Sequence, residues 1–75
     1  MDKLQFMDYT FMFNPDHSTY TNNEEGLTFF TLDGGVRIKI RFKNERLVLL
    51  PQSGVTIKKA DDKTYRIIAN EYQPV

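Results

Sequence analysis

The sequence predicts one small all-β domain, built as an antiparallel barrel or a curled meander sheet, with a short C-terminal helix as the one helical alternative. Three observations support this fold class. Of the 75 residues, 26 are β-branched or aromatic and only two are alanine, a composition that favours strands over helices. Clusters of turn-forming residues recur about every 8–12 residues, as in small sandwiches and barrels. Finally, residues 36–42 alternate strictly between apolar and cationic side chains, which is the period of a strand.

The turn clusters divide the chain into candidate strands. Because Asp33-Gly34-Gly35 supplies residues that tolerate positive φ angles, it predicts a hairpin that pairs the strand before it with the strand after it. We assign residues 1–75 to a single domain and expect residues 73–75 to form a frayed end. In chain order, the candidate strands are residues 4–13, 18–21, 27–32, 36–42, 47–50, 55–59 and 64–70.

The alternation in residues 36–42 predicts which side chains face the core. Successive side chains of a strand point to opposite faces, so the apolar and the cationic sets separate. We expect Val36, Ile38, Ile40 and Phe42 to face the core, and Arg37, Lys39 and Arg41 to face solvent.

The C-terminal segment 64–72 has two readings. Tyr65, Ile68, Ala69 and Tyr72 have the spacing of a helical stripe. Tyr65, Ile67 and Ala69 also alternate as in a strand, and β-branched residues are frequent here. Both structures remain open at this point.

The N-terminal segment 4–13 carries bulky side chains that a single strand would place on both of its faces. A chain this small covers both faces of one strand with difficulty, so a second subunit is a natural cover. This pattern predicts a homodimer. The expected interface residues are Phe6, Met7, Tyr9, Phe11 and Phe13.

Charge is distributed unevenly along a chain whose net charge is zero. Residues 1–35 carry one base and six acids, whereas residues 36–75 carry nine bases and four acids. Either the two halves neutralise each other in the fold, or they form two surfaces of opposite sign, one of which docks a partner.

The sharpest candidate site is the cationic side of the alternating strand. Phe29 and Phe30 are adjacent on the strand predicted to pair with it, so in any hairpin register one of the two lies on this side. Cations beside an aromatic ring suit a protein interface or single-stranded nucleic acid, although they are also common on a solvated surface. The expected partner-binding residues are Arg37, Lys39, Arg41, Lys43, Phe29 and Phe30.

Catalytic motifs are absent from the sequence. The single histidine, His17, follows Asp16 in a predicted turn, and there is no cysteine. We find no histidine pair, phosphate-binding glycine loop or calcium-loop spacing. The sequence therefore predicts neither an enzyme nor a cofactor or metal site.

These observations favour a non-enzymatic protein-binding module, of which a small phage- or mobile-element-type inhibitor of a host enzyme is one form. A single-stranded nucleic-acid-binding β-barrel is the alternative, which the zero net charge disfavours. A self-assembling structural subunit is a third. Charge interrupts the N-terminus too early for a signal peptide, and no apolar run reaches the length of a membrane span. We therefore expect a soluble, cytoplasmic protein.

Overall fold

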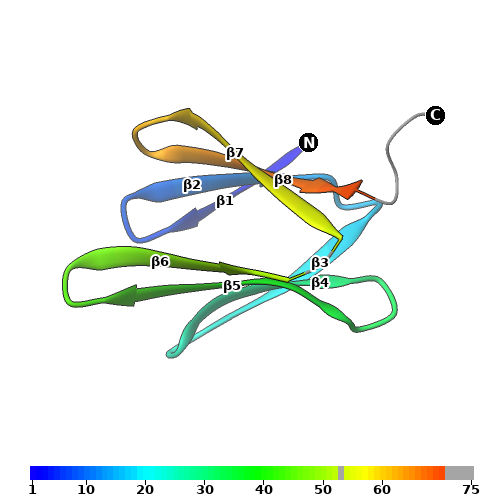
Figure 1. Cartoon of the computed structure of the whole chain (residues 1–75), viewed down its shortest axis with the longest axis horizontal. Coiled ribbons are helices and arrows are strands. Elements are labelled where there is room, and N and C mark those ends of the chain that lie inside the picture. The colour runs from blue at the N-terminus through cyan, green and yellow to red at the C-terminus, as the bar shows by residue number, and fades with distance from the viewer. Residues whose placement is uncertain (53, 71–75) are drawn as a thin grey trace.

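The described chain folds into two four-stranded sheets that face each other (Figure 1). This computed structural model describes residues 1–52 and 54–70. One sheet has the order β1-β2-β8-β7, and the other is a continuous meander, β3-β4-β5-β6. The strands are β1 (Asp2–Phe6), β2 (Tyr9–Phe13), β3 (Ser18–Asn23), β4 (Gly26–Thr31), β5 (Val36–Lys43), β6 (Arg46–Pro51), β7 (Val55–Asp61) and β8 (Thr64–Ala69).

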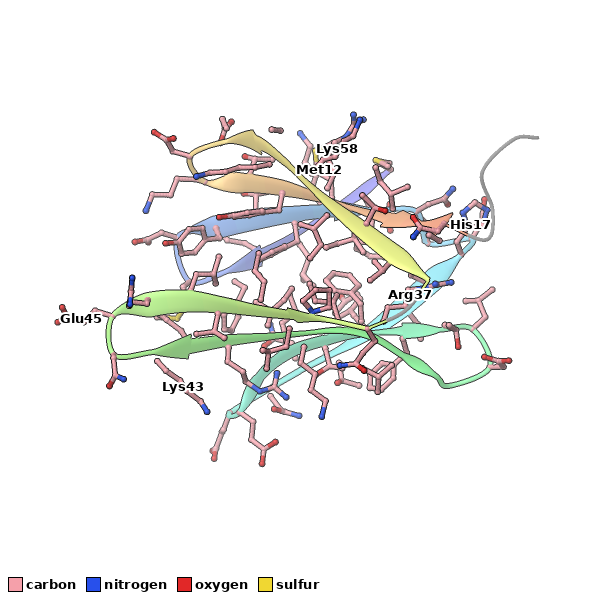
Figure 2. All side chains as sticks on the ribbon, in the orientation of Figure 1. Met12, His17, Arg37, Lys43, Glu45 and Lys58 are labelled. Carbon is pink, nitrogen blue, oxygen red and sulfur yellow. The ribbon has the colours of Figure 1, made fainter. Side chains whose placement is uncertain are left out.

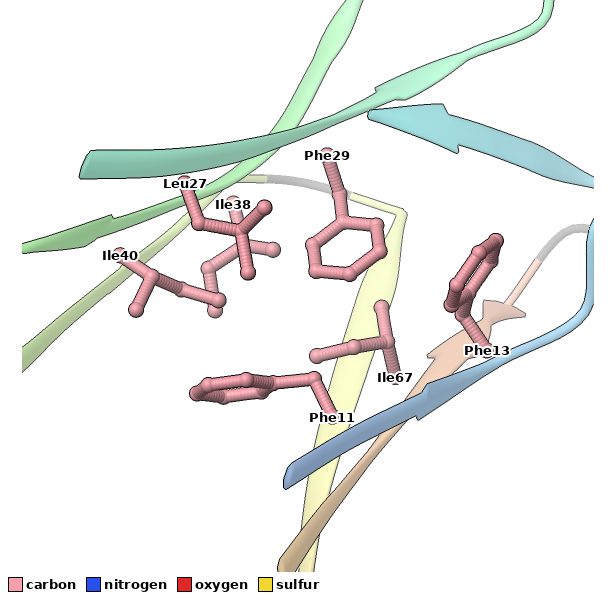
Figure 3. Packing of buried hydrophobic residues seen from close by; sticks show 7 residues of the cluster. All are labelled: Phe11, Phe13, Leu27, Phe29, Ile38, Ile40 and Ile67. Carbon is pink, nitrogen blue, oxygen red and sulfur yellow. The ribbon is translucent and has the colours of Figure 1, made fainter. Parts of the chain in front are cut away.

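The all-β prediction is confirmed, and so is the meander. The sheets do not pair with each other along their edges, so they form an open sandwich rather than a closed barrel. Their inner faces enclose one hydrophobic cluster, in which side chains from both sheets meet (Figure 3). Each fully buried aliphatic or aromatic side chain contributes roughly 1.5–3 kcal/mol. The cluster consists of Phe11, Phe13, Leu27, Phe29, Ile38, Ile40 and Ile67.

The N-terminal segment is a hairpin, which corrects the prediction of a single strand over residues 4–13. A two-residue turn at Met7 and Asp8 reverses the chain, and Met7 adopts a left-handed φ of 57°. Phe6 then lies opposite Tyr9, and opposite residues of an antiparallel pair share a face. The bulky side chains therefore gather on one face, where the other sheet of the same chain covers them.

The alternation in β5 holds from Ile38 onward and reverses before it. Ile38 and Ile40 are fully buried and Lys39 is exposed, as predicted. Phe29 pairs with Ile38 but Phe30 pairs with Val36, which leaves Arg37 as an extra residue. Because a β-bulge inserts one extra residue, the side chains before it point to the opposite face from the one that the alternation after it predicts. Val36 therefore shares the outer face with Phe30, and Arg37, predicted to be exposed, has only 1% of its surface exposed.

Arg37 joins the two places where the described chain crosses between the sheets. Its Nη1 donates a hydrogen bond to the carbonyl oxygen of Gly54 in the β6–β7 connection, at 3.1 Å. Its Nη2 donates to the carbonyl oxygen of His17 in the β2–β3 connection, also at 3.1 Å. Figure 2 shows Arg37 at the end of the sandwich where both connections lie. The bulge thus directs a guanidinium to one backbone carbonyl group in each of the two connections.

The C-terminal segment is a strand, so the helical alternative is not realised. β8 lies between β2 and β7, parallel to β2 and antiparallel to β7. Its inward residue Ile67 is 3% exposed and completes the core. Tyr72 and the expected frayed end at residues 73–75 lie outside the described residues. Within the described ranges, no helix is long and apolar enough to cross a membrane.

Candidate binding surface

The fold separates the charges that the sequence divides between its two halves. Nine of the ten Lys and Arg residues lie in strands, and Lys63 is the exception. Of the nine acidic residues in the described ranges, seven lie in turns, and Asp2 and Asp61 lie at strand ends. The sandwich therefore has cationic faces and an acidic rim.

Two of the rim acids stabilise turns directly. The Thr31 hydroxyl donates a hydrogen bond to Asp33 and lowers the pKa of that carboxyl. The backbone N–H of Lys63 donates to Asp61 at 2.8 Å and is the main reason for the lowered pKa of Asp61. These hydrogen bonds favour the charged carboxylates, so Asp33 and Asp61 have a structural role that explains their position.

The larger cationic surface is the outer side of the β3–β6 sheet. The four strands contain no Asp or Glu. Because Lys43 pairs with Arg46, the cations of β5 and β6 share this side, and neighbouring cations along β5 are roughly 7 Å apart. We define the cationic face as Lys39, Arg41, Lys43 and Arg46.

Arg41 is the member of this face that is fixed in position. It is half-buried, and its Nη1 donates hydrogen bonds to the carbonyl oxygens of Ile40 at 3.0 Å and Leu27 at 3.2 Å. It also lies 3.4 Å from the hydroxyl of Thr28. The guanidinium crosses β4 at Gly26, where the absence of a side chain leaves the necessary space. Arg41 thus presents its charge without the mobility of a free surface side chain.

Replacing Gly26 by alanine is expected to destabilise the fold by about 1–3 kcal/mol, the usual cost of overpacking. A Cβ at this position would lie 2.3 Å from the carbonyl oxygen of Ile40 and 3.0 Å from Cδ of Arg41. The φ of 138° adds strain for any residue with a side chain. Urea denaturation followed by circular dichroism measures this loss. Gly34→Ala is the matched control: its φ of 101° is also positive, but its Cβ would meet no atom within 4 Å. Equal losses in the two variants would show that crowding by Ile40 and Arg41 is unimportant.

Apolar side chains lie beside the cations on the same face. Phe30 and Val36 form a cross-strand pair at one end, and both are half-buried. Leu50 lies opposite Lys39, and Val48 lies opposite Arg41. Leu50 is 46% exposed. The surface therefore combines fixed positive charge with accessible apolar area.

The structure brings together only part of the predicted site. Lys39 and Lys43 are exposed, and Arg41 and Phe30 are half-buried, all on the outer face. Arg37 and Phe29 are wrong as surface residues, because both lie inside the sandwich. Sequence reasoning missed Arg46, Val48, Leu50 and Val36. The alternation of Arg46, Val48 and Leu50 with inward Leu47 and Leu49 was the signal that could have identified three of them.

Most residues of the predicted dimer interface on the N-terminal segment are covered by the single chain itself. Phe11 and Phe13 are 0% and 4% exposed within the single chain. Phe6 and Tyr9 are half-buried against the same core. Met7 is 59% exposed, but it lies in the turn. The observation that predicted a partner subunit, bulky residues on both faces, is explained by the hairpin.

A smaller cationic row crosses the outer side of the other sheet. Lys3 pairs with Met12, Met12 with Arg66, and Arg66 with Lys58. Figure 2 shows Met12 and Lys58 on the side away from the β3–β6 sheet, and Lys43 on the opposite side of the molecule. Met12 is half-buried, and the sulfur of Met1, a residue that is 60% exposed, lies 4.0 Å from Nη2 of Arg66. This row provides a matched comparison surface for the cationic face.

No group of three His, Cys, Asp or Glu residues that could hold a metal ion occurs in the described ranges. His17 is half-buried, and its carbonyl oxygen accepts the hydrogen bond from Arg37. Comparison of the chain with protein-family models, curated proteins and solved structures finds no match.

Proposed function

We propose that the protein is a non-enzymatic binding module that docks its cationic face on an acidic surface of a partner protein. The observation that carries this proposal is that β5 and β6 present four cations on the outer face of a sheet whose four strands contain no acidic residue. Complementary charge of this kind speeds encounter and fixes the orientation of a complex. The face is built on paired strands, so little conformational entropy is lost when it binds.

A protein partner fits this face better than single-stranded nucleic acid. Nucleic-acid platforms stack successive bases on several aromatic rings, whereas the outer side of this sheet carries one, Phe30. Protein interfaces combine arginine with apolar contacts, and here Arg41 and Arg46 lie beside Val48 and Leu50. Masking the acidic rim of an enzyme's active site in this way would make the module an inhibitor.

Charge reversal on the cationic face tests this function. The variant Lys39→Glu/Lys43→Glu/Arg46→Glu changes three exposed side chains and spares Arg41, which has hydrogen bonds within the fold. With poly-L-glutamate as the acidic probe, we expect at least about a tenfold loss of affinity, equivalent to roughly 1.4 kcal/mol. Isothermal titration calorimetry in physiological salt measures the affinity. Circular dichroism should show an unchanged fold.

The control variant Lys3→Glu/Lys58→Glu/Arg66→Glu makes the same change in net charge on the opposite face of the sandwich. We expect it to bind the probe nearly as tightly as the unaltered protein. Equal losses in the two variants would contradict a specific face, because binding would then depend on net charge alone. Tighter binding of oligothymidylate than of poly-L-glutamate would replace the proposal with nucleic-acid binding.

A further inference from the structure

The four edge strands of the sandwich differ in how they are protected against pairing. β1 begins with Asp2 and Lys3, and the five residues of β3 after Ser18 are exposed and mostly polar. β7 has two adjacent lysines and a shift of register between Lys59 and Asp61. Charges, polar residues and bulges of this kind prevent edge-to-edge pairing. β6 differs, because four consecutive residues, 47–50, are leucine or valine and its register is regular.

The free edge of β6 presents unpaired backbone groups. The Lys43–Arg46 pair closes a two-residue turn whose residues Asn44 and Glu45 both have positive φ angles, the geometry in which the closing pair is hydrogen-bonded. Six residues after Arg46, the N–H of Gln52 donates to the carbonyl oxygen of Arg37 at 2.7 Å. Hydrogen-bonded and non-hydrogen-bonded pairs alternate along an antiparallel ladder, so every second residue of β6 from Arg46 onward bonds to β5. The N–H and C=O groups of Leu47 and Leu49 therefore point away from β5, toward an edge that no described strand covers.

We propose that the edge of β6 binds the same edge of a second copy of this chain, antiparallel and about a two-fold axis through Val48. In this register Leu47 of one copy exchanges both backbone hydrogen bonds with Leu49 of the other, and the converse pair does the same. Val48 lies opposite Val48 of the second copy, in a pair without backbone hydrogen bonds. The two β3–β6 meanders become one continuous sheet.

A second copy fits this edge because the strand is complementary to itself. Arg46 lies opposite Leu50 of the other copy, so no cation faces another across the axis. Leu47 and Leu49, half-buried in the single chain, lie against each other and lose their remaining exposure. Pro51 has no N–H and ends the pairing at the point where β6 ends. Two-fold dimers with isologous interfaces are the commonest soluble homo-oligomers.

Pairing here also places two cationic faces side by side on one surface. The outer residues of β6 keep their orientation when the edge pairs, so Arg46 and Leu50 of each copy remain on the outer side. The dimer does not depend on the proposed partner, because it uses the edge of the sheet rather than its face. Loss of probe binding and loss of dimerisation are therefore separable results.

Sedimentation equilibrium from low to high micromolar concentration tests the dimer. We expect the mass to rise from 8.8 kDa toward twice that value. Amide hydrogen exchange at Leu47 and Leu49 should slow as concentration rises. Val48→Cys introduces the only thiol in a chain without cysteine. At the axis its Cα lies about 4.5 Å from its copy, within the roughly 4.4–6.8 Å that a disulfide spans, so mild oxidation should give a covalent dimer.

Thr21→Cys is the matched control, because Thr21 is exposed at the outer side of β3, the opposite edge of the same sheet. We expect it to cross-link much more slowly than Val48→Cys. A constant mass of 8.8 kDa across the concentration range, together with equal cross-linking rates for the two variants, would overturn the proposal. Concentration-independent exchange at Leu47 and Leu49 would overturn it as well, without any variant.

Discussion

Replacing Arg37 by methionine is expected to leave the chain largely unfolded. Methionine retains much of the side chain's apolar stem but removes the hydrogen bonds to His17 and Gly54. Hydrogen bonds that involve a charged group contribute about 1.5–3 kcal/mol each. A domain of this size keeps only about 3–5 kcal/mol of net stability. Losing both bonds therefore removes most of it, and frees the two connections that hold the sheets together.

Urea denaturation and the melting temperature measure this effect. Lys39→Met is the control, since it removes a cation two residues away at an exposed position and should change stability by no more than about 0.5 kcal/mol. Arg37→Lys should rescue little, because an ammonium group lacks the planar fork that reaches both carbonyl oxygens. An Arg37→Met variant as stable as the Lys39→Met control would show that Arg37 does not secure the connections.

Much of the fold could be predicted because its signals are local. The turn at Asp33-Gly34-Gly35 lies between β4 and β5 as expected, and these two strands pair as a hairpin. The alternation from Ile38 to Phe42 fixes their inner and outer faces. Likewise, the strand reading of residues 64–70 follows from residues that alternate, and β8 covers Thr64–Ala69. Each of these features depends on residues within a single strand or turn.

The features that were missed depend on pairing rather than on local sequence. Met7 and Asp8 form a turn without glycine or proline, so a single turn-favouring residue, Asp8, was all that marked the N-terminal hairpin in the sequence. The bulge exists only in the register of β4 against β5. The bulge turns the side chain of Arg37 into the sandwich, where it bonds to the two connections between the sheets. The predicted binding site therefore wrongly included Arg37. The remaining cations of β5 keep the predicted face because they lie beyond the bulge.

Replacing Phe29 by alanine is expected to cost about 3–5 kcal/mol, the usual loss for a buried phenylalanine. Phe29 is fully buried, and the centre of its ring lies 5.1 Å from that of Phe13 on the opposite sheet. The ring of Tyr20 also contacts it, with 6.1 Å between the centres. Alanine would leave a cavity between the sheets that neighbouring side chains fill only in part. In a domain this small, the variant should be mostly unfolded.

Phe30→Ala is the matched control, because it removes the same ring from the next residue, which lies on the outer face. Phe30 is half-buried beside Val36, so only part of its apolar area leaves water on folding, and we expect a loss of roughly 1 kcal/mol. Urea denaturation of both variants compares the two positions directly. A loss at Phe30 as large as that at Phe29 would mean that the outer face is covered like a core. The cationic face would then lack the accessible apolar area on which a protein interface depends.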